Sequence, residues 1–402
     1  MTKATTVKAV LATLVMSLAW GCSSRAGLDD VRQTKAQASI DKGVAFLLSR
    51  QGDDGSWLHD PAMTALACTA LHQSRSQAHA EAVKAAVAKG RLLILQAVQQ
   101  DGSFRDREGK YINYTTAVCL SALAVINHPD DQPILRRARR FILDSQLDED
   151  NPDRPTAKGT AYYGGIGYGS AGPDRPDLSN TQLALEALAL TDHLDSEAAG
   201  GKPEDAAKSK LAWENALAFL KACQNVPADA GPAWVVSDQP DPSADGGFIY
   251  KPGESKASDK LAGDDDGEKE TLRSYGSMTY AGLKSMIYAK LGKDDMRVKA
   301  AAEWARRNYR LDENPGMGPE GHFYYLLTFA KAHAALGAET VKTPDGKEHN
   351  WRQDLVDVLV ALQKPDGHWL NEKHGRWMEG LPELVTSYAL ATLEVAVGDG
   401  GK

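Results

Sequence analysis

Thr64-Ala-Leu-Ala-Cys-Thr-Ala-Leu71 is the first of six related apolar segments that recur along this chain of 402 residues. The other five are residues 116–123, 181–188, 279–286, 325–332 and 386–393, and five of the six segments begin with Thr. Each has the apolar periodicity of a buried helix. Self-similarity at a period of tens of residues predicts a stacked or closed array of helix pairs.

A turn precedes each apolar segment, and an amphipathic helix precedes the turn. Three turns contain glutamine: Gln51-Gly-Asp-Asp-Gly-Ser-Trp57, Gln100-Asp-Gly-Ser-Phe104 and Gln363-Lys-Pro-Asp-Gly-His-Trp369. Glycine-rich versions occupy units three to five, at residues 163–168, 245–248 and 314–318. Asp-Gly supplies a positive φ at low cost. We expect the glutamine to bond to free carbonyls at the helix end or to the next unit's turn.

These turns resemble the QW repeats of squalene and oxidosqualene cyclases, within the wider prenyltransferase/squalene-oxidase repeat family. The resemblance covers roughly residues 37–397. It implies an all-α fold, an α6/α6 toroid in which six helix pairs form one closed barrel. Two loop insertions, at residues 192–210 and 225–272, interrupt the repeat. An open solenoid of the same helix pairs is the structural alternative.

Residues 1–22 have the features of an export signal. Lys3 and Lys8 give a positive start, and the apolar stretch 9–18 is too short to span a bilayer. The end, Ala19-Trp-Gly-Cys22, resembles a bacterial lipobox. This resemblance implies lipidation of Cys22, a membrane anchor at the cell envelope and a polar tether over residues 23–36. A plain secretory signal or an uncleaved anchor is the alternative.

The net charge bears on the class of binding partner, and the number of cysteines bears on disulfide formation. The net charge of −8 disfavours nucleic acid as a partner. Three cysteines follow Cys22, an odd number that favours buried free thiols over a disulfide framework. They are Cys68, Cys119 and Cys223.

The chain departs from the catalytic motifs of the families it resembles. Class II cyclases use an Asp-x-Asp-Asp acid, whereas the nearest match here, Asp264-Asp265-Asp266, has the wrong spacing and lies in a hydrophilic stretch. Zinc prenyltransferases use an Asp-x-Cys pair and a His at inner-helix starts, and neither occurs at the corresponding positions. We therefore expect no metal and no cofactor, and we leave open whether the protein is an enzyme.

The toroid suggests where a ligand would bind. Its inner helices run parallel, so their N-termini converge on one mouth that suits a polar head group, above a channel for an apolar tail. The candidate catalytic residues are His322, Glu320 and Tyr325, because Glu320 is near enough in sequence to tune His322. The candidate ligand-binding residues are Asp60, Asn113, Tyr114, Asp177, Asn180, Arg273, Tyr275, Trp377, Glu379 and Glu383. The alternative role for most of them is a helix cap or an inter-helix hydrogen bond.

Three functions are compatible with this pattern. The first is a central cavity that binds an apolar or isoprenoid-like small molecule, with or without turnover. The second is a polysaccharide lyase or hydrolase, because α/α barrels also host that chemistry. The third is a noncatalytic interaction scaffold at the cell envelope.

Overall fold

The computed structural model describes residues 27–169, 175–226, 244–257 and 272–398. The described residues are mainly helical. The two strands among them, β1 Val341–Lys342 and β2 Glu348–His349, form an antiparallel hairpin with Val341 opposite His349. The α-helices are α1 Asp30–Ser49, α2 Pro61–Gln73, α3 Ala80–Gln96, α4 Ile112–Ile126, α5 Gln132–Asp144, α6 Leu178–Leu190, α7 Pro203–Ala222, α8 Gly276–Tyr288, α9 Met296–Arg307, α10 His322–Leu336, α11 Trp351–Leu362 and α12 Pro382–Val397. The predicted all-α class is confirmed.

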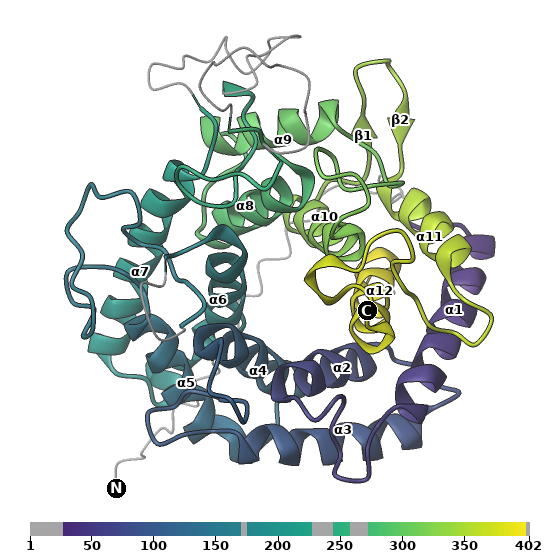
Figure 1. Cartoon of the computed structure of the whole chain (residues 1–402), viewed down its shortest axis with the longest axis horizontal. Helices are drawn as coiled ribbons and strands as arrows, with labels where there is room; N and C mark the ends of the chain where they lie inside the picture. Colours follow the sequence, from purple (N-terminus) through teal and green to yellow (C-terminus); the bar gives the residue numbers. More distant parts are fainter. Residues whose placement is uncertain (1–26, 170–174, 227–243, 258–271, 399–402) are drawn as a thin grey trace, which may run out of the picture.

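The even-numbered helices form an inner ring, and the odd-numbered helices surround it (Figure 1). Each inner helix packs against the next, and the ring closes where α12 packs against α2. Because the first and last units touch, the open solenoid is excluded. The α6/α6 toroid expected from the repeat is confirmed, and the six apolar segments of the sequence are its inner helices.

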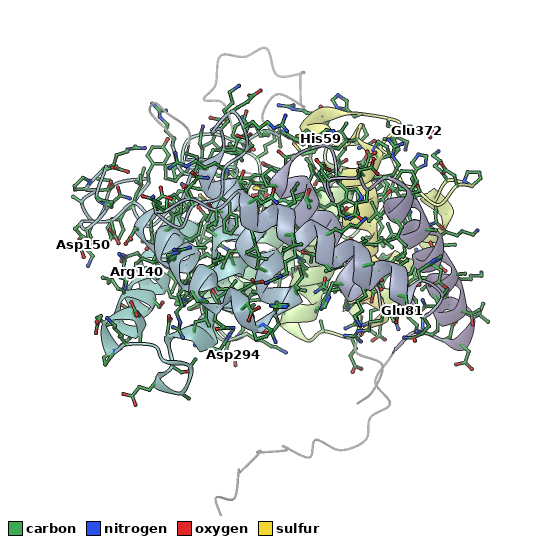
Figure 2. All side chains as sticks on the ribbon, turned by 90° about the horizontal axis from the view of Figure 1, so that it is seen from below. His59, Glu81, Arg140, Asp150, Asp294 and Glu372 are labelled. Carbon is green, nitrogen blue, oxygen red and sulfur yellow. The ribbon has the colours of Figure 1, made fainter. Side chains whose placement is uncertain are left out.

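The ring has two rims. Figure 2 labels His59 and Glu372, from the turns that precede α2 and α12, on one rim. It labels Glu81, in the first turn of α3, and Asp294, just before α9, on the opposite rim. We call the first rim the N-terminal mouth, because the inner helices begin there, and the second the C-terminal rim.

Five threonines show why the inner helices open with the same residue. Each hydroxyl accepts the backbone N–H of the apolar residue that ends the preceding turn, at 2.9–3.1 Å. The pairs are Thr64 with Trp57, Thr116 with Phe104, Thr181 with Ile166, Thr279 with Phe248 and Thr386 with Trp369. All ten side chains are buried. Since a buried N–H without a partner costs about 1–3 kcal/mol, each threonine stabilises its unit.

Four glutamines each link their own unit to the next one. Each side-chain amide donates to a glycine carbonyl of its own turn and to a carbonyl of the following outer helix. Gln51, Gln146 and Gln224 reach α3, α7 and α9 in this way. Gln363 of the last unit reaches Ser39 on α1 and so ties the end of the repeat to its beginning. The contact to the next unit is made to its outer helix.

In the described residues the ring of helices begins with α1 and ends with α12. Helix α1 begins at Asp30, inside the stretch 23–36 expected as a tether, and α12 ends at Val397. The first insertion, 192–210, contains the 3₁₀ helices η2 Asp192–Asp195 and η3 Glu197–Ala199 and the start of α7. Most of the second insertion, with its Asp264–Asp266 run, lies outside the described residues, as does Cys22.

Two further findings concern the described part of the chain. None of its helices is long and apolar enough to cross a membrane. Cys68, Cys119 and Cys223 are buried free thiols, as the odd number of cysteines predicts.

Candidate ligand site in the lumen

The three candidate catalytic residues have three separate sets of partners. His322 begins α10; its Nε2 lies 2.8 Å from the Leu311 carbonyl, and burial lowers its pKa. Glu320 is buried and pairs with Arg376 at 2.7 Å. The Tyr325 hydroxyl donates to the Arg310 carbonyl at 2.6 Å. The structure therefore does not join them into one constellation.

Asp60, Asp177 and Asn180 take part in the N-terminal caps of α2 and α6. Asp60 caps α2 by accepting the N–H of Met63 at 2.8 Å. Asp177 caps α6 by accepting the backbone N–H of Asn180 at 2.9 Å and its side-chain amide at 2.8 Å. Burial raises the pKa of Asp60. The structure gives these residues the capping role that the sequence left as an alternative.

The two glutamate candidates are also engaged. Glu379 is 1% exposed and lies at the start of α10, where it accepts the Tyr324 N–H at 2.8 Å and the Asn371 side-chain amide at 2.7 Å. Burial raises its pKa to about 7. Glu383 pairs with Arg50, at the end of α1, at 2.7 Å. Both carboxylates therefore join neighbouring units.

Three more candidates, Asn113, Arg273 and Trp377, lie in or beside the turns at the mouth. Asn113 donates its backbone N–H to Tyr168 at 2.9 Å and its side-chain amide to Gly167 at 3.2 Å. The Arg273 carbonyl accepts the Ser255 hydroxyl at 2.5 Å. The Trp377 side chain is 42% exposed, with the Arg376 guanidinium 4.7 Å from its ring centre. These residues hold or cover the turns at the mouth.

The last two candidates, Tyr114 and Tyr275, belong to a larger set of tyrosines at the mouth. Burial is the main cause that raises the pKa of each member, and further raising comes from charged or phenolic neighbours. All of the phenols are therefore protonated at neutral pH. The set is Tyr114, Tyr168, Tyr250, Tyr275, Tyr324 and Tyr388.

Some of these tyrosines reach across the inside of the ring. The Tyr324 hydroxyl on α10 accepts from the Gln182 amide at 3.1 Å and lies 3.3 Å from the Ser179 hydroxyl, both on α6. The phenols of Tyr114 on α4 and Tyr388 on α12 lie close enough for each to shift the pKa of the other. Since α8 separates α10 from α6 and α2 separates α4 from α12, these contacts lie on the inner face of the ring, which we call the lumen face.

A charged cluster lies deeper on the lumen face. Glu186 on α6 contacts Lys284 on α8 and Lys331 on α10, each with an oxygen–nitrogen distance of 2.5 Å. The Lys284 side chain is 1% exposed, whereas Glu186 and Lys331 keep exposures of 13% and 27%. The cluster therefore faces accessible space while one of its ammonium groups is fully buried.

The cluster carries an excess of one positive charge, because two ammonium groups face one carboxylate. Burial alone would raise the pKa of Glu186, but the two lysines outweigh it and lower the pKa to about 2. Burial lowers the pKa of Lys284 to about 8, although Glu186 opposes the change. At pH 7 Glu186 and most of Lys284 are therefore charged, and Lys284 loses its proton as the pH rises through about 8.

The cluster occupies one layer of the repeat. The sixth residue of the inner segments is Thr69, Ser121, Glu186, Lys284 or Ala391, and Lys331 lies one place later in unit five. Thr69, Ser121 and Ala391 are half-buried and come from α2, α4 and α12, the other half of the ring. Small neutral side chains thus lie opposite the charges. Sequence reasoning missed the cluster because it searched helix starts, whereas the signal was a charge inside an apolar segment.

An apolar layer separates the charged layer from the mouth. The third residues of the inner segments include Leu66 and Leu183, both half-buried. From the mouth inward, the lumen face is therefore phenolic, then apolar, then charged on one side. Among the described residues, no group of three His, Cys, Asp or Glu side chains is placed to hold a metal ion.

Comparisons with known proteins bear on the fold. No family model matches the chain, and no curated protein matches it in sequence. The type II terpene cyclase MstE from Scytonema, in complex with merosterolic acid A, has a TM-score of 0.49 and 14% identity over 92% of this chain and 99% of that chain. A protein from Actinoplanes has a TM-score of 0.48 and 16% identity over 90% and 100%.

A family 76 glycoside hydrolase from a bovine Bacteroides thetaiotaomicron strain is also similar. Its TM-score is 0.51 at 8% identity, over 90% of this chain and 77% of that chain. At such identities the likeness is one of fold and leaves the QW repeat and any activity untested. The chain has the α/α toroid fold, and its architecture is similar to that of this glycoside hydrolase.

Proposed function

We propose that this protein binds an amphipathic, isoprenoid-like molecule with an anionic head group inside the ring. The observation that carries the proposal is the Glu186–Lys284–Lys331 cluster, which has one positive charge in excess and faces small side chains. Binding of an anion would neutralise that charge in a setting where water screens it poorly. Lys331, with 27% exposure, is the ammonium group that a ligand reaches most easily.

The rest of the ligand has matching surfaces. Leu66 and Leu183 offer an apolar layer for a hydrocarbon chain, and the tyrosines offer ring faces at the mouth. Gln182 is 1% exposed, and its amide donates to the Tyr324 hydroxyl, so it holds that phenol in place at the lumen face. We infer from these groups a ligand with a polar end and an apolar body.

Binding is favoured over catalysis because the mouth carboxylates are already engaged. Asp60 and Asp177 cap helices, Glu379 sits on the α10 amides, and Glu383 and Glu320 pair with arginines. A glycan lyase or hydrolase would need a pair of carboxylates free to exchange protons with its substrate. We therefore propose a binding protein without a chemical step, whose repeats are of the QW type.

Calorimetric titration with farnesyl diphosphate and farnesol tests this proposal. The diphosphate should bind at least tenfold more tightly than the alcohol, and the difference should shrink above pH 8 as Lys284 loses its charge. Lys331→Met should remove most of the difference. Lys299→Met, on outer helix α9 and 51% exposed, is the matched control and should bind as the parent does. Equal affinity for the two compounds, or protection from unfolding by cellohexaose alone, would overturn the proposal.

We further propose that the protein is exported and held at the cell envelope by a lipid on Cys22. The positive start at Lys3 and Lys8, the apolar stretch 9–18 and the lipobox-like end support this proposal. Labelling cells with radioactive palmitate should mark the protein in the membrane fraction. Cys22→Ser should lose the label and leave that fraction. A parent protein that is unlabelled and soluble would contradict the anchor.

A further inference from the structure

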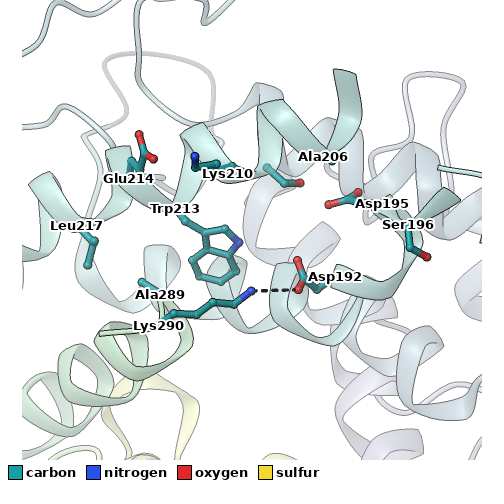
Figure 3. Close-up of a pocket in the computed structure, with 11 residues that line it drawn as sticks. Asp192, Asp195, Ser196, Ala206, Lys210, Trp213, Glu214, Leu217, Ala289 and Lys290 are labelled. Carbon is teal, nitrogen blue, oxygen red and sulfur yellow. Dashed lines mark ion pairs between the residues drawn. The ribbon is translucent and has the colours of Figure 1, made fainter. Parts of the chain in front are cut away.

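A separate pocket of about 470 Å³ lies at the C-terminal rim, beside the ends of α6 and α8. Figure 3 shows residues that line it. One wall is a face of α7, on which Ala206, Lys210, Trp213 and Leu217 follow each other at helical spacing. The other walls are η2 and the residues that follow α8, including Lys290. This volume is within the range of sites that bind small organic molecules.

Trp213 is the main aromatic surface of the pocket. Its half-buried indole projects from α7 toward Lys290, with the carboxylates of Asp192 and Asp195 to one side (Figure 3). Lys290 bridges toward Asp192, with 3.6 Å between the ammonium and the carboxylate. An exposed aromatic face flanked by hydrogen-bonding groups suits a ring that is apolar on its faces and polar at its edge.

The charges of the pocket balance. Asp192, Asp195 and Glu214 supply three carboxylates, and Lys210 and Lys290 supply two ammonium groups. The buried guanidinium of Arg139, directly behind Asp195, supplies the third positive charge. With no charge in excess, the pocket favours an uncharged polar ligand over a phosphate or a cation.

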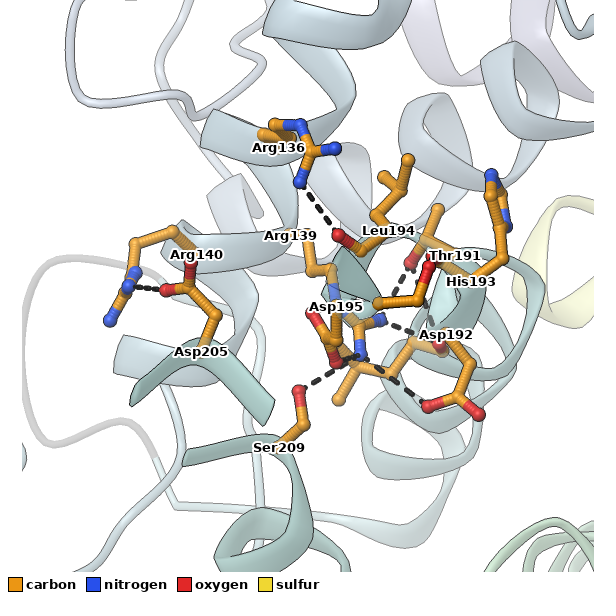
Figure 4. Close-up of polar contacts among 12 residues, drawn as sticks. Arg136, Arg139, Arg140, Thr191, Asp192, His193, Leu194, Asp195, Asp205 and Ser209 are labelled. Carbon is orange, nitrogen blue, oxygen red and sulfur yellow. Dashed lines mark hydrogen bonds and ion pairs between the residues drawn. The ribbon is translucent and has the colours of Figure 1, made fainter. Parts of the chain in front are cut away.

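The arginine also makes the pocket rigid (Figure 4). Arg139 is 3% exposed and grips the Asp195 carboxylate with two bonds of 2.9 and 2.5 Å. It also donates to the Leu188 carbonyl, the Thr191 hydroxyl and the Ser209 hydroxyl at 2.6–2.9 Å. These bonds join α5, the end of α6, η2 and α7. The pocket is therefore formed before any ligand arrives.

Lys290 has an unusual backbone conformation for its residue type. Its φ is +64°, just after the end of α8, where glycine is the usual residue. A lysine at this position is strained relative to glycine, and its side chain lies over the pocket. The strain is consistent with a part for this ammonium group in holding a ligand.

We propose that the Trp213 pocket is a second ligand site, independent of the lumen, that takes one unit of a neutral saccharide. The indole would stack on the apolar face of a pyranose ring. Asp192 and Glu214 would accept hydrogen bonds from its hydroxyl groups, and Lys210 and Lys290 would donate to them. Several polar groups around one aromatic face give such a site its orientation and specificity.

Calorimetric titration with cellohexaose, mannohexaose and xylohexaose tests the site, with hexagalacturonate as the charged comparison. At least one neutral hexaose should bind, and the charged one should bind at least tenfold more weakly. Trp213→Ala should reduce the affinity for the neutral sugar at least tenfold. Leu211→Ala, on the same helix and 38% exposed outside the pocket, should bind as the parent does.

Lys290→Gly separates binding from folding. It should keep or raise the temperature of unfolding, because glycine tolerates this φ, and it should weaken saccharide binding several-fold. The site is overturned if no neutral hexaose binds, if Trp213→Ala binds like Leu211→Ala, or if hexagalacturonate binds as tightly as the neutral sugars. Loss of farnesyl diphosphate binding in Trp213→Ala would also contradict the independence of the two sites.

Discussion

The turns at the mouth and the charged layer in the lumen are made by the same repeat, yet they differ in how much the units resemble each other. In the turns, a threonine hydroxyl accepts the same backbone N–H in five units out of six. In the lumen layer, the corresponding residues are neutral in three units and charged in the other three. Positions that repeat stabilise the ring, whereas positions that differ between units determine the charge of the lumen face.

The largest expected effect tests the repeated positions. Trp369 is fully buried, and its indole N–H donates to the Leu359 carbonyl at 2.8 Å. Trp369→Ala should lower the free energy of unfolding by about 3–5 kcal/mol, because it leaves a cavity and an unpaired carbonyl. Urea denaturation measures this loss. Trp377→Ala, at an exposed position, should change stability by less than about 0.5 kcal/mol. Similar losses of stability in the two variants would contradict the structural role given to the buried turn residue.

The next effect tests the divergent layer. Glu186→Gln should cost about 3 kcal/mol at pH 7, because it leaves the buried Lys284 ammonium without its carboxylate. The cost should shrink toward pH 9, since burial already lowers the pKa of Lys284 to about 8 and the unpaired amine loses its proton more readily. Lys284→Met, which removes the buried charge and leaves Glu186 paired with Lys331, should cost far less. Urea denaturation at pH 7 and pH 9 measures these losses of stability. A loss in Glu186→Gln that does not change with pH would contradict an ionic cluster.

The contrast between the two regions also explains what the sequence could predict. The fold could be predicted because the threonine, the glutamine and the Asp-Gly turn make the same local hydrogen bonds in several units. A pattern formed by residues that are close together in the chain can be recognised from one sequence. Unit five was the hardest to align, because Tyr325 replaces the threonine there and Asn314 holds the turn by bonds to Ser277 and Glu320.

The candidate site was less predictable for two physical reasons. Asp and Asn bind ligands at helix starts, but they also cap helices, and the structure places Asp60 and Asp177 in caps. The charged cluster instead joins Glu186, Lys284 and Lys331 from three helices. Their proximity depends on ring closure and helix rotation, which are properties of the whole fold. Nothing local to any one of the three segments reveals its partners.

A smaller effect concerns Glu379, the buried carboxylate at the mouth. Burial raises its pKa from 4.5 to about 7, so the folded state binds the proton more tightly than the unfolded state does. Its contribution to stability is therefore fully present below pH 4.5 and is lost as the pH rises through 7. The loss is at most about 3.5 kcal/mol, because each pKa unit represents about 1.4 kcal/mol. Glu379→Gln should flatten this part of the pH profile of urea midpoints, and parallel profiles would contradict the raised pKa.

The smallest effect separates two adjacent tyrosines on α10. The Tyr325 hydroxyl bonds to a backbone carbonyl at Arg310, whereas the Tyr324 hydroxyl meets Gln182 and Ser179 on the lumen face. Tyr325→Phe should cost about 1 kcal/mol in urea denaturation, the value of one hydrogen bond, and should leave farnesyl diphosphate binding unchanged. Tyr324→Phe should weaken that binding at a similar cost in stability, because it frees Gln182 from its fixed position. If Tyr325→Phe proves to be the variant that loses ligand, the lumen assignment fails and the site returns to the helix start where the sequence first placed it.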